Sequence, residues 1–425
     1  MRNFRILRLA NAAHYSGVEK EYLNQINPNW VLQSYQEQKA IWDSRYYVYA
    51  DSFSYWMRKL GNEAMDIVVD CVSLQSSWAR ENDINTLLDD WKIDTVLAQI
   101  GKFKPDVVYL QDVHVLPSSI RKSLKSIFPF IKLVVIFRGY PGGSLRYFAD
   151  FCDADMLLVS APQLVTKFEQ LGKEAHLVYH SFDHRINRFL NTVLDKDKVQ
   201  LSFVGSLGYG TSEHAERANL INILSAQSEL TIYSDDPWQN SSINSKVQNA
   251  FGRLISFAVQ DYRVRKLGRN ILAYKHLFPI SIKSKLKKII MAGRLTHKNL
   301  QIGTKIFPGV HGLNMYQALA NSKISFNAHS NAAKGAVENM RMFQATGVGS
   351  CLLTDWGRNI SELFEPDREV ICYKTPEELI DKLRQLESND NLRAEIAKNG
   401  QLRVLRDHTT EKRVAQIHTL ISTKL

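Results

Sequence analysis

The sequence has no long hydrophobic run: nothing in its 425 residues approaches the roughly 18 uninterrupted apolar residues of a membrane-spanning helix. Its first residues, MRNFRILRLANAAHYSG, include basic side chains but no long apolar run followed by a cleavage site, so we expect no signal peptide. Internal repeats and low-complexity tracts are also absent. With 44% apolar and 23% charged residues, the chain is typical of a globular protein, and its length favours two domains of roughly 150–200 residues.

Cysteine is scarce as well. The four cysteines, Cys71, Cys152, Cys351 and Cys372, are scattered along the chain and lack the close spacing of a metal site. Reduced thiols in a cytoplasmic protein are the plain interpretation.

Acidic residues are missing from one long segment. No Asp or Glu lies between Asp261 and Glu338, whereas fourteen Lys or Arg residues do, so this segment accounts for the net charge of +11 and the rest of the chain is slightly acidic. A basic patch of this density favours phosphates, whether of a nucleotide, a nucleic acid or an anionic lipid surface. A merely solubilising face is the alternative, but such faces usually mix both signs of charge.

Residues 237–305 form a basic insert in which apolar residues recur at helical intervals beside basic ones. This pattern is typical of a helix that lies at a membrane surface. A basic linker packed on the second domain is the alternative. We assign an acceptor-binding or membrane-binding surface to Arg263, Arg265, Lys266, Arg269, Lys285, Lys287 and Lys288.

The first part of the chain alternates short apolar runs with amphipathic segments. Such alternation predicts a parallel sheet with helices on both faces. One long helix is expected over residues 83–105. Strands are expected over residues 5–10, 65–72, 106–112, 132–139, 155–161 and 174–182.

The alternation stops at a polar connector and then restarts, which predicts a second α/β domain. Further strands are expected over residues 200–206, 229–235, 323–330, 350–355 and 369–374. Ligands of such sheets bind beyond the carboxyl ends of the strands. We predict an N-terminal domain over 1–182, a linker over 183–198, a C-terminal domain over 199–405 that contains the insert, and a C-terminal helix over 406–425 that could cross back to the N-terminal domain.

Four stretches follow one another near the end of the chain: MYQALANSKISFNAHS (315–330), RMFQATGVGSCLLTD (341–355), ISELFEPDREVICYKTPEELIDKL (360–383) and LRAEIAKNGQLRVLRDHTTEKR (392–413). In this order and spacing they resemble the CgeB-like, spore-coat-type glycosyltransferase family. FVGS at 203–206 and HSFDHRI at 180–186 fit the same family's domain start and interdomain crossing. The resemblance implies GT-B architecture: two Rossmann-like parallel-sheet domains that face a central cleft, with the nucleotide-sugar donor bound mainly by the second.

The resemblance places the donor beside the segment that precedes a Gly-x-Gly turn. The position of Gln344 is usually Glu in such enzymes and accepts from the ribose hydroxyls; the amide can still accept through its carbonyl oxygen, but without charge. Arg341 would face the diphosphate, because a guanidinium fork fits two oxygens at once. Gly347 would bring backbone close to the donor, or would only permit the turn from helix to strand.

Two further groups follow strand ends in the second domain. Gly205, Ser206 and Gly208 form a glycine-containing loop that could direct backbone N–H groups toward the diphosphate or the sugar. Glycines after a strand are common, so the argument depends on the position of this loop at the start of the domain. Asn327 and His329 are candidate sugar or phosphate contacts, and a histidine satisfied within its own loop is an equal alternative.

Inverting transfer also needs a base and a means of stabilising the leaving diphosphate. Enzymes of GT-B architecture generally stabilise it with basic side chains and helix dipoles, so we expect no metal and no cofactor, and we interpret the DxD-like triplets at 153–155 and 234–236 as coincidental. For each candidate base a structural role is the alternative. The candidates at strand ends of the first domain are His14, Asp112, His114 and His180, with Arg138 and Gly139 as a further pair at the same edge.

We therefore predict a metal-independent glycosyltransferase that moves a sugar from a nucleotide-diphosphate-sugar to a glycan or lipid-linked acceptor in bacterial surface polysaccharide assembly. It would be cytoplasmic, could bind the inner face of the cell membrane, and is not expected to bind nucleic acid. Three alternatives stay open: a degenerate GT-B protein with a structural or binding role, favoured by Gln344; a basic nucleic-acid-binding protein; and a nucleotide-sugar epimerase, although no obvious set of acid/base carboxylates is present.

Overall fold

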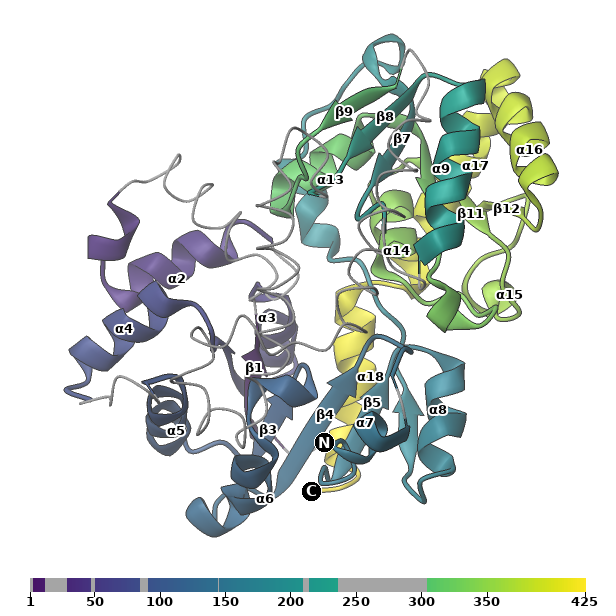
Figure 1. Cartoon of the computed structure of the whole chain (residues 1–425). Helices are drawn as coiled ribbons and strands as arrows, with labels where there is room; N and C mark the ends of the chain where they lie inside the picture. The colour runs from purple at the N-terminus through teal and green to yellow at the C-terminus, as the bar shows by residue number, and fades with distance from the viewer. Residues whose placement is uncertain are drawn as a thin grey trace, which may run out of the picture. The chain divides into compact units, whose positions relative to one another are not determined.

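A computed structural model describes residues 3–11, 29–46, 50–84, 91–143, 145–208, 214–235 and 304–425 (Figure 1). The chain divides into two compact units. The larger unit comprises Met1–Phe203 and Val310–Leu425, and the smaller unit comprises Val204–Gly309. Among the helices of these described ranges, none combines the length and apolar character that crossing a membrane requires.

The N-terminal sheet is parallel throughout, with the strand order β2-β1-β3-β4-β5-β6. Each strand is a short run of apolar residues, and most of these side chains are buried because helices cover both faces of the sheet. The carboxyl ends of the strands therefore meet at one edge. The strands are β1 (Arg5–Ala10), β2 (Glu63–Val68), β3 (Val107–Leu110), β4 (Leu133–Arg138), β5 (Met156–Val159) and β6 (Ala175–Leu177).

Alternate strand residues point to opposite faces of this sheet and build two separate cores. Leu7 and Val108 pack on one side with residues from α5 (Trp91–Phe103), α6 (Ser118–Ile127), α7 (Leu145–Ala149) and α8 (Pro162–Glu169). Ile6 and Val107 pack on the other side with α3 (Ser52–Lys59) and α18 (Thr410–Ser422). The C-terminal helix α18 thus completes the N-terminal core, and Figure 1 shows it beside β4 and β5.

Three predicted elements differ from the structure, one of them the strand expected over 174–182, of which only Ala175–Leu177 (β6) is a strand. The strand expected over 65–72 ends at Val68, because the chain turns there into α4 (Val72–Glu81); the side-chain amide of Gln75 in this helix donates to the Val68 carbonyl (2.9 Å). Of the helix expected over 83–105, the described residues show α5; Asp83, with a left-handed φ of 54°, lies in the turn that follows α4, and residues 85–90 lie outside the described residues. Helix α2 (Tyr35–Asp43) was not predicted.

The second sheet is also six-stranded, with the order β12-β11-β10-β7-β8-β9. Its strands are β7 (Val199–Val204), β8 (Leu230–Tyr233), β9 (Lys305–Phe307), β10 (Ser322–Asn327), β11 (Cys351–Asp355) and β12 (Ile371–Tyr373). The helices that accompany it are α9 (Ala215–Gln227), α13 (Gly312–Ala320), α14 (Met340–Gly347), α15 (Ile360–Leu363), α16 (Pro376–Ser388) and α17 (Asp390–Asp407). Two parallel sheets with flanking helices confirm the predicted α/β fold class.

Candidate active site

A cavity of about 350 Å³ lies in the larger unit, at the carboxyl ends of the N-terminal strands. Asp112 follows β3, Arg138 ends β4, and His180 follows β6, so three polar side chains that the sequence placed at strand ends line one space. Helices from the C-terminal part of the chain contribute other wall residues: Tyr316 of α13, Met340 of α14 and Arg413 of α18.

Asp112 has two fixed partners. Its Oδ1 caps the following turn by accepting from the backbone N–H of His114 (3.0 Å), and its Oδ2 accepts from Nη1 of Arg138 (3.2 Å). Arg138 is largely buried and also donates to the Gly142 carbonyl (2.9 Å), with its guanidinium over the ring of Tyr147. The carboxylate thus holds a cation at the cavity wall.

His114 does not share this cavity. Its side chain is half exposed, and its Nε2 lies 3.1 Å from the hydroxyl of Tyr147. The residue sits in a short 3-10 turn, Val113–Val115, which directs the two residues after Asp112 away from the strand direction. A catalytic role for His114 stays a prediction that this placement does not support.

His180 lines the cavity in an environment that keeps its imidazole neutral. Burial lowers its pKa to about 4; the hydrogen bond with the Gly139 backbone opposes this shift, and the positive charge of Arg413 adds a smaller lowering effect. Glycine is required at 139, since a Cβ there would lie 2.9 Å from the ring of Phe137 and 3.1 Å from that of His180. A ring nitrogen with a free lone pair at neutral pH can accept a proton or a hydrogen bond.

The pair that precedes the Gly-x-Gly turn lies at the start of α14. Arg341 donates through Nη1 to the side-chain oxygen of Gln344 (2.8 Å), and Gln344 donates through Nε2 to the hydroxyl of Tyr316 (3.3 Å). Gln344 is buried, and Tyr316 and Met340 beside it line the cavity. The structure therefore connects the predicted donor-binding pair to the cavity wall through Tyr316.

Asn327 and His329 make internal contacts at the carboxyl end of β10. Asn327 donates to Thr354 of β11 and accepts from Asn339, the N-cap of α14 (2.9 Å each). The Nδ1 of His329 lies 2.7 Å from Oδ1 of Asp355; burial alone would raise the pKa of this carboxyl, but the charge and hydrogen bonds of His329 outweigh it and lower the pKa. Both residues fasten strand ends to one another, and their contact with a ligand stays a prediction.

An aromatic ring packs directly against Gly347 and leaves no room for a side chain. A Cβ at this position would lie 2.4 Å from Cγ of Phe182, and the Gly347 carbonyl accepts from Asn187 and Gln401. Packing therefore accounts for the glycine. The positive φ of 85° falls on Gly349, in the turn between α14 and β11.

The glycine loop after β7 belongs to the smaller unit. Gly205 and Gly208 have φ values of 153° and 71°, and a Cβ at 208 would meet the side chain of His214 at 2.1 Å. The hydroxyl of Ser206 accepts from the Gly208 N–H (3.1 Å). The loop thus requires glycine for its backbone, and its role in donor binding stays a prediction.

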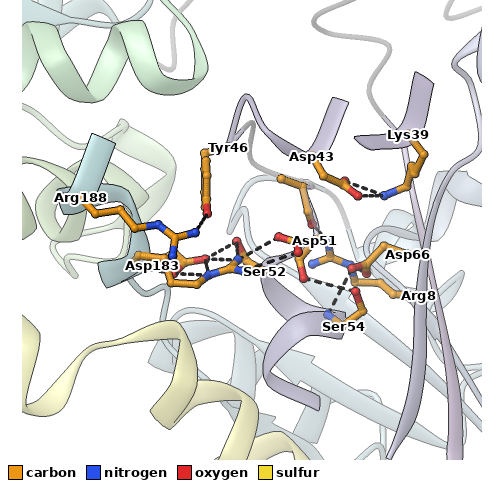
Figure 2. A network of polar contacts seen from close by, with 12 residues as sticks. Arg8, Lys39, Asp43, Tyr46, Asp51, Ser52, Ser54, Asp66, Asp183 and Arg188 are labelled. Atoms are coloured by element: carbon orange, nitrogen blue, oxygen red, sulfur yellow. Dashed lines mark hydrogen bonds and ion pairs between the residues drawn. The ribbon is translucent and has the colours of Figure 1, made fainter. Parts of the chain in front are cut away.

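A polar network beside the cavity was not predicted from the sequence (Figure 2). Arg185 donates to Asp183 (2.6 Å) and Asp51 (2.9 Å), and Ser52 donates to Asp183 (2.7 Å). On β1, the buried Arg8 pairs with Asp66 (2.6 Å). Two features of the sequence could have indicated this network. One is an arginine inside an apolar strand, and the other is the set of charged residues in the HSFDHRI segment, which connects the N-terminal sheet to the linker.

The remaining predicted residues lie outside the described residues. They are His14 and the basic set Arg263, Arg265, Lys266, Arg269, Lys285, Lys287 and Lys288. Within the described ranges no cluster of His, Cys, Asp and Glu could hold a metal ion.

Comparison with known proteins agrees with this architecture. A protein-family model described as glycosyl transferase-like matches residues 282–419. No curated protein matches the chain. Similar solved structures include Anabaena HepE (Alr3699) in complex with UDP-glucose (12% identity, TM-score 0.58, 99% of this chain and 100% of that one) and sucrose-phosphate synthase from Thermosynechococcus elongatus (10%, 0.54, 99% and 98%). A glycosyltransferase from Rickettsia africae is also similar (11%, 0.51, 100% and 99%).

At these identities the solved structures show the fold: the chain has the two-domain GT-B fold, as expected. The family match over the C-terminal part and this fold together support a GT-B glycosyltransferase. The narrower likeness to CgeB-like transferases stays a prediction.

Proposed function

We propose that the protein transfers a sugar from a nucleotide-diphosphate-sugar to a glycan or lipid-linked acceptor, in the assembly of a bacterial surface polysaccharide. The observation that carries this proposal is the cavity that unites polar strand ends of the N-terminal sheet with Tyr316 and Met340, next to Arg341 and Gln344. HepE, of the same fold, has been solved with UDP and glucose. Donors of that class suit a site that contains an arginine side chain, because a guanidinium binds two phosphate oxygens at once.

In this proposal Arg341 binds the diphosphate, and Gln344 holds the guanidinium of Arg341 in place and accepts from the ribose. The Gln344 carbonyl oxygen has two lone pairs, one of which accepts from Arg341, so the other can accept from a ribose hydroxyl. Cationic side chains would stabilise the leaving diphosphate, so we expect chelation by EDTA to leave the transfer rate unchanged.

His180 is our choice for the group that accepts the acceptor's hydroxyl proton. Its imidazole lines the cavity and, with a pKa of about 4, is uncharged at pH 7. Asp112, by contrast, already accepts hydrogen bonds from Arg138 and from the backbone of His114. Acid–base assistance of this kind contributes about 100-fold to 10,000-fold to a rate.

The test is a thermal-shift screen of the full chain against UDP, GDP, CMP, dTDP, ADP and their sugar conjugates. A ligand that binds only the folded state raises the melting temperature, so one nucleotide should stand out. Arg341→Ala should abolish that shift without unfolding the protein. Arg368→Ala is the matched control, because Arg368 is exposed and, among the residues that the structure describes, its only ion pair is with Glu365 (3.3 Å). No shift with any nucleotide at millimolar concentrations would refute the proposal.

A degenerate GT-B protein that binds without transfer is the rival, and Gln344 in the place of the usual glutamate favours it. The two are separated by supplying the sugar conjugate of whichever nucleotide binds and measuring released nucleoside diphosphate. Binding with no release, either with water or with an added glycan acceptor mixture, would favour the rival.

We also propose that the basic insert at 237–305 brings the protein to an anionic membrane. The support is the composition of that segment, which lacks acidic residues from 262 onward. Co-sedimentation with phosphatidylglycerol vesicles should fall steeply as salt rises, and equal binding to neutral phosphatidylcholine vesicles would contradict it.

A further inference from the structure

One cation at the cavity stands apart from the other charged side chains. Five Asp or Arg side chains line the cavity, and four of them belong to ion pairs: Arg8 with Asp66, Asp112 with Arg138, and Asp183 with Arg185. Within the described part of the chain, the fifth, Arg413 of α18, makes no contact with a carboxylate.

The contacts of Arg413 are all with neutral groups. Nε donates to the Tyr179 carbonyl (3.2 Å), Nη1 to the Asp407 carbonyl (3.5 Å), and Nη2 lies 2.6 Å from Nδ1 of His408. His408 is neutral, because burial lowers its pKa to about 4, and its Nε2–H donates to the Leu363 carbonyl (2.8 Å), which leaves Nδ1 as the acceptor for Arg413. A guanidinium has five N–H groups, so among the described residues two of them stay available to a ligand.

Hydroxyl donors lie on the same part of the wall. Ser181 and Thr410 both line the cavity, and their hydroxyl oxygens are 3.1 Å apart, so one hydrogen joins them and the other is free to donate outward. Thr410 is the first residue of α18, where the helix dipole adds positive potential. Burial disfavours the charge of Arg413 and lowers its pKa, so an anion bound here would offset that cost.

We propose that Arg413, with the hydroxyls of Ser181 and Thr410, binds a phosphate group of the ligand that occupies this cavity. The proposal rests on the proposed function only in its choice of ligand: the phosphate belongs either to the nucleotide-sugar donor or to a phosphorylated acceptor. A planar guanidinium and adjacent hydroxyls supply the charge-assisted hydrogen bonds that phosphate oxygens accept.

The probe is inorganic phosphate, titrated against the full chain with thermal stability as the readout. Arg413→Gln should raise the phosphate dissociation constant by about 10-fold to 100-fold, the range for a hydrogen bond to a charged group. Arg403→Gln is the matched control: Arg403 also donates to a backbone carbonyl (Leu363, 3.0 Å) but does not line the cavity, so its phosphate response should equal that of the wild type. Nonspecific salting effects of phosphate are common to all three proteins.

Ser181→Ala provides a second variant if Arg413→Gln fails to fold, and should weaken phosphate binding a few-fold. Equal phosphate dissociation constants for the wild type, Arg413→Gln and Ser181→Ala would overturn the proposal. So would a wild type whose melting temperature shows no saturable response to phosphate.

A competition experiment then distinguishes the two sources of the phosphate. If phosphate displaces the nucleotide found in the screen, and Arg413→Gln weakens that nucleotide, the site holds the donor's diphosphate. If nucleotide and phosphate bind together and the nucleotide's affinity is unchanged, the site serves a phosphorylated acceptor. A phosphate site that depends on Arg413 in a protein that binds no nucleotide would leave this inference standing and refute the transferase instead.

Discussion

Adding one methyl group at Gly347 should destabilise the protein, although the position is helical. A Cβ there would lie 2.4, 2.5 and 2.8 Å from the Cγ, Cδ1 and Cδ2 atoms of Phe182, well inside contact distance. Phe182 cannot move away easily. Its ring is completely buried, its N–H donates to the His408 carbonyl (3.0 Å), and its carbonyl accepts from Thr410 (2.9 Å).

The expected magnitude follows from two opposing effects. Overpacking of a well-packed core costs about 1–3 kcal/mol. Replacing glycine by alanine inside a helix gains up to about 1 kcal/mol, and Gly347 ends α14, so only part of that gain applies. We therefore expect Gly347→Ala to lower the free energy of unfolding by about 1–2 kcal/mol.

Thermal and urea unfolding of the wild type and four variants would test this estimate. Phe182→Leu removes the obstructing ring, so the double variant should be less destabilised than the sum of the single variants. Gly101→Ala is the control, because a Cβ at 101 meets only Phe128 at an ordinary 3.4 Å, and we expect it to be neutral or stabilising. A Gly347→Ala protein as stable as the wild type, or strict additivity in the double variant, would refute the packing account.

Three further predictions concern charged and titrating groups. Arg185→Met leaves Asp51 and the buried Asp183 without their shared cation and should lower the free energy of unfolding by about 3–5 kcal/mol, measured in urea; a change below 1 kcal/mol would contradict the network's importance. Since the folded-state pKa of His408 is about 4 and its unfolded value is about 6.5, the unfolded state gains a proton first as the pH falls, so stability is full above about pH 6.5 and is lost toward pH 4. His408→Gln should therefore lose less melting temperature than the wild type between pH 7 and 4. His180→Asn should lower kcat by about 100-fold or more with the nucleotide-induced thermal shift intact, and the wild-type pH profile should have no limb near 6.5.

The strands were predictable because their apolar runs are short and separated by amphipathic segments, as a doubly covered parallel sheet requires. The boundary after β2 was not: apolar residues recur as far as Val72, but the strand ends at Val68, whose carbonyl accepts from the side chain of Gln75, seven residues further on. Periodicity does not report such a side-chain contact.

Among the site residues, those at strand ends could be predicted from the sequence, and those brought in by long-range packing could not. Asp112 and His180 meet because parallel strands end at one edge, and strand ends can be located in a sequence. Arg413 could not be found this way, since it reaches the cavity only because α18 packs on the N-terminal sheet, far from its neighbours in the chain. The need for glycine at 347 could not be predicted either, because the residue that excludes a larger side chain, Phe182, is remote in sequence.

The packing of α18 on the N-terminal sheet has a consequence for synthesis on the ribosome. Val414, Ile417 and Ile421 fill a face whose strands are made in the first part of translation. At about 5–20 residues per second, that apolar face waits on the order of tens of seconds for the helix that covers it. During this interval the nascent chain exposes an apolar surface that chaperones can bind, and a ribosome that stalls before residue 410 leaves this surface uncovered for proteases and for aggregation.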